Sequence, residues 1–269
     1  MITRLLQLIM LSFKEGVRDR ALLGVIGMAV LMFLSTMAIV TMYGYDIMKV
    51  TVDLNLSVVG FAGLLLCFFI NINLVAKDID KRTIHCVLSK PISRAEYIIG
   101  KYTGTLALII LAIILLATVG AGMILLIKLS YPARYFEHFS WLAYIQAIVY
   151  EMAMFLVLNA VIIFFSSLSS SSFLTLLYSL ATYVAGQSIE EVVNFITTMK
   201  GPDETGRVMF WQVMQYIFPN FSAFDIKVLV SHGISMPTTH TLLLLSYSLF
   251  YTLLLLCFSI LIFSKRELQ

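Results

Sequence analysis

The sequence predicts an all-α integral membrane protein, a single domain over residues 1–269 that forms a six-helix transmembrane bundle. Hydrophobic residues make up 60% of the chain and charged residues only 12%, whereas a soluble domain of this length needs more polar surface. The charges are also clustered, and a helix that crosses about 30 Å of hydrocarbon needs roughly 20 apolar residues. Five long stretches contain no Asp, Glu, Lys or Arg: Ala21–Met42, Leu54–Ala76, Tyr102–Ile127, Met152–Ile189 and Thr241–Ser264. Runs this long and without alternation are not typical of barrel strands.

The number of spans follows from the lengths of these stretches. Four of them fit one span each, but Met152–Ile189 is too long for one span and too short for two. Two spans fit if this stretch is divided at the serine cluster around Ser169 and the earlier helix begins near Trp141. The predicted spans are therefore 21–42, 55–77, 99–127, 141–165, 172–189 and 241–264.

The distribution of Lys and Arg predicts the orientation. Six spans place both termini on one side, and that side carries twelve of the 18 basic residues. They are Arg4, Lys14, Arg18, Arg20, Lys77, Lys81, Arg82, Lys90, Arg94, Lys101, Lys265 and Arg266. Cytoplasmic loops are enriched in Lys and Arg, so we expect both termini in the cytoplasm and the chain in the inner (cytoplasmic) membrane. No basic stripe with interleaved aromatic residues is present, so we expect no nucleic-acid partner.

Two segments outside the spans have patterns of their own. Residues 1–20 place Leu5, Ile9 and Phe13 on one helical face and charges on the other, which predicts a helix in the membrane interface. A simple charged lead-in to the first span is the alternative. The external segment 190–240 contains an acidic turn and then an aromatic stretch, which favours short helices that dip into the outer leaflet or cap the bundle. An ordinary folded loop is the alternative there.

The chain contains no pattern typical of an enzyme. Gly100-Lys101 is followed by Tyr102 and lacks the upstream glycine of a phosphate-binding loop, so we expect no ATP site. The four histidines and three cysteines are scattered without the spacing of metal ligands. We therefore expect no catalytic residues, no metal and no cofactor bound by this chain.

Polar residues inside the predicted spans are candidates for an intramembrane polar site. Glu151 lies about ten residues inside the fourth span, where an ionisable group is costly and indicates function by default. If Trp141–Tyr150 is instead an external interfacial helix, Glu151 lies near the surface. Asn159 is the second polar residue considered for this site, although a hydrogen bond between helices explains it more simply. Gly100 and Gly104 form a GxxxG spacing that permits a close helix contact.

The loop at 78–95, between the second and third spans, predicts a short amphipathic helix. Pro91 ends it, and Ser93 with Glu96 three residues later predicts a capping box for the next helix. Such a helix suits docking of a soluble partner, whereas a connector resting on lipid is the alternative. The apolar face of the helix comprises Ile79, Thr83, Ile84, Val87 and Leu88, and the charges expected to set its register are Asp80, Arg82 and Arg94.

Three motifs give the chain a resemblance to a known family. They are Arg82-Thr83, the run from Leu88 to Arg94 (Leu-Ser-Lys-Pro-Ile-Ser-Arg), and the run from Gly100 to Gly104. The segment Pro219–Asp225 fits a Pro-Asn-x-x-x-Phe-Asp pattern as well. Over its whole length the chain resembles permease subunits of type-2 ATP-binding-cassette (ABC-2) exporters, closest to the subgroup labelled multicopper-enzyme-maturation permeases.

The resemblance implies several partners. They are a second permease copy, in a homodimer or with a paralogue, and two cytoplasmic ATPase subunits that bind ATP and magnesium. The 78–95 loop would be the coupling helix in an ATPase groove, the path would run between the permease copies in the lipid bilayer, and the last external segment would form a cap or gate. A periplasmic accessory protein is a further candidate partner, and the cargo is not indicated.

Two other functions remain as alternatives. A self-contained secondary transporter would favour repeated halves, and residues 1–135 show no convincing repeat in 136–269. An intramembrane enzyme would need paired catalytic groups, which Glu151 alone does not supply.

Overall fold

The computed structural model describes residues 2–18, 21–42, 46–76, 93–136, 139–169, 171–198, 214 and 217–265. Within these residues the chain forms α-helices and short 3₁₀ and π turns, without a strand, so the all-α prediction is confirmed. The coupling residues Ile79, Asp80, Arg82, Thr83, Ile84, Val87 and Leu88 lie outside the described residues.

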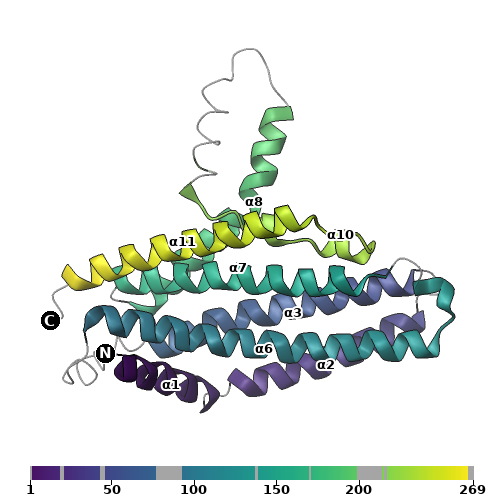
Figure 1. Ribbon diagram of the computed structural model, residues 1–269, viewed down its shortest axis with the longest axis horizontal. Helices are drawn as coiled ribbons and strands as arrows, with labels where there is room; N and C mark the ends of the chain where they lie inside the picture. The colour runs from purple at the N-terminus through teal and green to yellow at the C-terminus, as the bar shows by residue number, and fades with distance from the viewer. Residues whose placement is uncertain are drawn as a thin grey trace.

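Five long helices form the bundle, and each is long and apolar enough to cross a membrane. They are α2 (Ala21–Met42), α3 (Ile47–Asn71), α6 (Arg94–Ser130), α7 (Trp141–Leu168) and α11 (Thr238–Lys265). They lie side by side in Figure 1, where α2 and α6 run in one direction and α3, α7 and α11 in the other. We call the end that holds Arg94 and Lys265 the terminal end, and the end that holds Ser130 and Trp141 the loop end. In chain order, α3 continues at the terminal end into a π turn, η1 (Ile72–Ala76).

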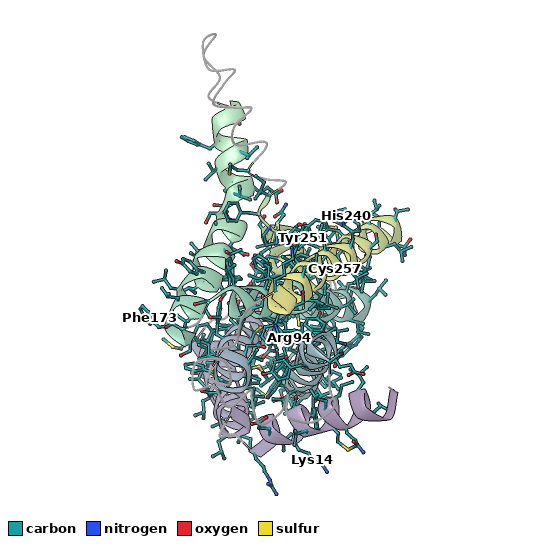
Figure 2. The ribbon with its side chains drawn as sticks, turned by 90° about the vertical axis from the view of Figure 1, so that its left-hand side faces the viewer. Lys14, Arg94, Phe173, His240, Tyr251 and Cys257 are labelled. Carbon is teal, nitrogen blue, oxygen red and sulfur yellow. The ribbon has the colours of Figure 1, made fainter. Side chains whose placement is uncertain are left out.

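The sixth predicted span, 172–189, falls in α8 (Ser172–Thr198), which is not among the five helices that qualify as spans. Its serine, threonine and glutamine residues make α8 less apolar than the five bundle helices. Figures 1 and 2 show its first part beside the bundle and its second part leading away from it. Because α7 and α11 run in the same direction, the chain between them still has to return from the terminal end to the loop end. Among the described residues, part of α8 and residues 217–237 contribute to this return.

Small residues and polar side chains hold the central helices together. A Cβ at Gly63 of α3 would collide with the Phe155 ring of α7, so the missing side chain lets these helices approach closely. Between α6 and α7, the Thr105 hydroxyl donates to Asn159 Oδ1 at 3.2 Å, and Asn159 Nδ2 donates to the Tyr102 carbonyl at 3.1 Å. Small residues and interhelical hydrogen bonds are the usual means of helix association in lipid.

The N-terminal helix α1 (Ile2–Arg18) lies obliquely on the outside of the bundle near the start of α6 (Figures 1 and 2). The two glycines of the GxxxG spacing form this contact. A Cβ at Gly100 would lie 2.5 Å from Leu8 Cδ2, and one at Gly104 would lie 3.0 Å from the Ile9 carbonyl oxygen. A salt bridge of 3.1 Å between Lys101 and Glu15 adds to it, and the Lys101 side chain is buried by the contact. The glycine pair therefore makes a close helix contact, and its partner is α1.

The surface of α1 is divided into three lengthwise strips, one buried, one exposed and apolar, and one exposed and charged. Leu8, Ser12 and Gly16 are buried against the bundle, and a second strip exposes large apolar side chains, Leu6 and Met10 among them. A third strip exposes charge, including Lys14 and Arg18. An exposed apolar strip beside a charged one is the arrangement expected of a helix at the boundary between lipid and water.

Replacing Gly104 by leucine should detach α1 from α6. Even a Cβ at this position would lie 2.6 Å from the Ser12 Cβ and 3.0 Å from the Ile9 backbone oxygen, which cannot rotate away. We expect a loss of about 1–3 kcal/mol, the usual cost of overpacking, seen as a lower melting temperature of the purified protein in detergent. Gly122→Leu is the matched control on the same helix, because a Cβ there meets no atom within 4 Å. Equal melting temperatures for the two variants would contradict the assigned contact.

Candidate functional site

The segment before α11 folds back onto the bundle and forms one wall of the site. It contains a 3₁₀ turn, η3 (Ser222–Phe224), and a short helix, α10 (Lys227–Ser231). Phe221 and Phe224 are both buried, and the Phe221 backbone N–H donates to the Gly186 carbonyl of α8 at 3.1 Å. Gly186 leaves room for this approach, since a Cβ there would meet the Pro219 carbonyl oxygen and the Phe221 ring. The Pro-Asn-x-x-x-Phe-Asp segment thus packs against α8.

Asn220 connects this segment to two helices. Its side-chain oxygen accepts a hydrogen bond from the Ala223 backbone at 3.2 Å, and its amide donates to Glu190 of α8 at 3.1 Å. Its own backbone N–H donates to the Tyr247 hydroxyl of α11 at 3.0 Å. The Ser222 hydroxyl lies 2.6 Å from the same Glu190 oxygen. One asparagine therefore sets the position of the chain that enters α10.

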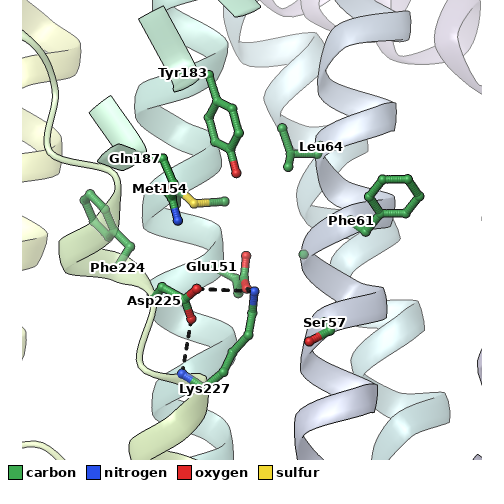
Figure 3. Close-up of a pocket in the computed structure, with 11 residues that line it drawn as sticks. Ser57, Phe61, Leu64, Glu151, Met154, Tyr183, Gln187, Phe224, Asp225 and Lys227 are labelled. Carbon is green, nitrogen blue, oxygen red and sulfur yellow. Dashed lines mark hydrogen bonds and ion pairs between the residues drawn. The ribbon is translucent and has the colours of Figure 1, made fainter. Parts of the chain in front are cut away.

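A pocket of about 200 Å³ lies between α3, α7, α8 and this segment. Its polar lining is shown in Figure 3 and comprises Ser57, Glu151, Tyr183, Gln187, Asp225 and Lys227. The rest of the lining is apolar and includes Leu64, Met154 and Phe224. The pocket therefore combines apolar walls with a few polar groups that converge from all of its walls, which is the usual form of a small-ligand site.

Glu151 is buried in this pocket, with 5% of its surface exposed. Helix α7 begins at Trp141, where the Ser140 side chain accepts a hydrogen bond from the Ala143 backbone, so Glu151 lies about 15 Å from the start of the helix. The structure therefore places Glu151 inside the bundle instead of near the surface. Gly60 of α3 makes this possible, because a Cβ there would lie 2.9 Å from one carboxylate oxygen.

The charges in the pocket do not balance. Lys227 Nζ lies 3.7 Å from Glu151 Oε1 and 3.7 Å from Asp225 Oδ2 (Figure 3). Asp225 also accepts a hydrogen bond from the Lys227 backbone N–H at 3.3 Å. Two carboxylates thus share one ammonium, which leaves a formal charge of −1 when all three are ionised. Glu151 Oε2 is buried and has no hydrogen-bond partner within the described structure.

The other residues singled out from the sequence lie elsewhere. Asn159 is about two turns beyond Glu151 on α7 and is bonded to α6, so the two residues do not form one site. Arg94 begins α6 at the terminal end, where its guanidinium donates to the Phe263 and Ser264 carbonyls of α11 at 2.9 and 3.0 Å. Ser93 and Glu96 form the predicted capping box in front of it.

Asp225, Lys227 and Tyr183 are pocket residues that the sequence analysis did not identify. Lys227 is one of the six basic residues outside the cytoplasmic set, and Asp225 is the last residue of the Pro-Asn-x-x-x-Phe-Asp pattern. The motif could have drawn attention to Asp225, but no local pattern indicates that it faces Glu151, which lies 74 positions earlier in the chain.

Replacing Asn220 by alanine should destabilise the wall that carries Asp225 and Lys227. The change removes the hydrogen bond to the Ala223 backbone and leaves the Glu190 carboxylate with one donor fewer. We expect a loss of about 1–3 kcal/mol, measured as a lower melting temperature in detergent. Ser231→Ala is the control in the same segment, because Ser231 is more exposed and bonds to a carbonyl of its own turn. An unchanged melting temperature for Asn220→Ala would show that this wall does not depend on the asparagine.

Comparison with known proteins agrees with the helical bundle. Among curated proteins, none matches this chain. The family model described as "ABC-2 family transporter protein" matches residues 6–268, which is nearly the whole chain. A match over this length includes most of α1, all five bundle helices and the pocket segment. The chain therefore belongs to the ABC-2 transporter family and is a multi-pass membrane permease of an ABC transporter, a kind of subunit that works with an ATP-binding-cassette ATPase.

Proposed function

We propose that this permease is an exporter subunit that works as a dimer, as a homodimer or with a paralogue, and is driven by separate cytoplasmic ATPases. The observation that carries the proposal is the family match over residues 6–268, on a chain whose sequence contains no phosphate-binding loop. Energy from ATP and magnesium would then come from the partner ATPase. The resemblance to multicopper-enzyme-maturation permeases adds a candidate periplasmic accessory protein.

The terminal end of the bundle is proposed to face the cytoplasm from the inner membrane. Lys14, Arg18, Arg94, Lys101 and Lys265 all lie on elements at this end, where α1 packs on the start of α6 and α11 ends (Figure 1). Basic residues accumulate on the cytoplasmic side of membrane proteins. Both termini would then be cytoplasmic, and the pocket segment would lie toward the outside.

The 78–95 loop is proposed as the element that receives movement from the ATPase. It connects the π turn η1 to Arg94, and Arg94 is bonded to the last carbonyls of α11. A push on the loop would therefore reach three helices at once, namely α3, α6 and α11. Helix α11 packs along α7, which carries Glu151, so the same movement would reach the pocket.

The proposed orientation predicts a labelling pattern for single cysteines in a background without native cysteines. Cysteines at Ser89 and Ser264 should be protected from a membrane-impermeant thiol reagent added to intact cells, because both would be cytoplasmic. A cysteine at Asp203 should react. Permeabilised cells serve as the control, in which all three should be labelled. External labelling at Ser89 would reverse the orientation and contradict the proposal.

Replacing Leu88 by aspartate should uncouple the permease from its ATPase. The change puts a charge into the predicted apolar face of the loop, and buried anchors of an interface commonly cost about 2 kcal/mol or more when lost. We expect the ATPase to be lost on copurification, or to remain bound while hydrolysis no longer drives transport. Membrane insertion should survive, because the residue would lie outside the lipid.

Asp203→Ala, in the external segment, is the control for this experiment and should keep both ATPase binding and transport. Both variants are compared in the same detergent by copurification and ATPase rate, and in the same vesicles by transport. If Leu88→Asp retains the ATPase and transports at the normal rate, the loop is only a connector.

A further inference from the structure

The pocket around Glu151 contains a carboxylate oxygen that is buried and unpaired within the described residues. Glu151 Oε1 faces Lys227, and its other oxygen, Oε2, is buried and has no hydrogen-bond partner in the described part of the chain. Leaving a buried carboxylate oxygen unpaired costs free energy, and a donor that reaches it would recover that cost. In Figure 3 one oxygen of this carboxylate is turned toward Lys227 and the other toward the side of the pocket where Tyr183 lies.

The walls of the pocket favour an organic cation over a metal ion. Tyr183 and Phe224 contribute aromatic rings to the lining, and Leu64 and Met154 add apolar surface. Aromatic rings attract ammonium groups through their negative faces, whereas a metal ion needs several oxygen, nitrogen or sulfur ligands. Within the described residues, no group of three or more His, Cys, Asp or Glu side chains is arranged to hold a metal ion.

The size of the pocket limits the ligand. A volume of about 200 Å³ corresponds to roughly six or seven water molecules at about 30 Å³ each. A protonated amine with a short apolar substituent fits this space, with its charged head at Glu151 and its substituent against Leu64 and Met154. A larger transported molecule could place only its ammonium group and a short apolar part in the pocket.

We propose that this pocket recognises a compact organic ammonium group of the transported molecule, with Glu151 as the anchoring residue. The assignment of the ligand as cargo rests on the proposed function, whereas binding itself does not. The ammonium group donates a hydrogen bond to Glu151 Oε2, and Lys227 remains shared between Glu151 Oε1 and Asp225. Two carboxylates and two cations then balance. Lys227 already offsets part of the negative charge of Glu151 and Asp225, so its presence weakens the attraction of the pocket for the ligand.

The first test uses the unaltered full chain in nanodiscs of zwitterionic lipid, without the ATPase. Propylammonium and propan-1-ol have nearly the same size and differ in charge, so calorimetric titration with each measures what the charge contributes, after subtraction of empty discs. We expect propylammonium to bind at least ten times more tightly than propan-1-ol, and KCl to compete weakly. Equal binding of the two probes, or displacement by potassium at equal concentration, would overturn the proposal.

Three variants then locate the binding site. Glu151→Gln keeps the shape and removes the charge, so propylammonium should bind at least ten times more weakly. Lys227→Met removes the offsetting ammonium, so binding should become several times tighter, a result that a purely structural ion pair would not produce. Glu191→Gln is the matched control, since Glu191 is an exposed carboxylate on α8 outside the pocket. Unchanged binding in Glu151→Gln, or weaker binding in a folded Lys227→Met protein, would contradict the assignment.

The outcomes separate this proposal from the proposed function. If Glu151→Gln does not fold, the comparison of the two probes on the unaltered protein and the Lys227→Met variant still decides the question. If the ATPase copurifies but propylammonium does not bind, the exporter assignment stands and the ammonium site is rejected. If propylammonium binds but no ATPase copurifies, the site stands and the exporter assignment is rejected.

Discussion

The close approach of α3 to α7 is the contact on which the rest of this structure depends. In lipid, apolar side chains gain little from leaving their surroundings for one another, so helices associate where small residues let them pack closely. Gly60 and Gly63 of α3 face Glu151 and Phe155 of α7, and a Cβ at either glycine would collide with these side chains. The same contact that closes the core therefore also creates the space for a buried carboxylate.

Two buried polar residues on α7 differ in how completely their side chains are paired. Asn159 gives and accepts hydrogen bonds with α6, so its burial is compensated within the protein. Glu151 has an ammonium at 3.7 Å on one side and an unpaired oxygen on the other. A buried polar group whose hydrogen bonds are all made strengthens a helix contact. One that lacks a partner can still accept a hydrogen bond from a ligand. This difference separates a structural residue from a candidate binding residue.

Specific polar contacts hold the bundle at its terminal end and again farther along its length. At the terminal end, Lys101 binds Glu15 of α1, and Arg94 binds the last carbonyls of α11. Toward the loop end, Asn220 joins the pocket segment to α8 and α11. Helix α11 takes part in both sets of contacts. It thereby links the start of α6, which follows the proposed coupling loop, to the wall that carries Asp225 and Lys227.

The sequence by itself determined the features that depend on neighbouring residues and on the lipid. Long uncharged stretches dictate membrane helices, because hydrocarbon offers no partners for backbone groups and a helix satisfies them internally. The capping box at Ser93 and the close contact at Gly100 and Gly104 could be predicted for the same reason, since they depend on spacings of three or four residues. The tertiary structure decided the rest: that the glycine pair faces α1, that α8 leaves the bundle, and that Glu151 meets Lys227. These are contacts between distant parts of the chain, and they follow from how the helices pack, which no local pattern records.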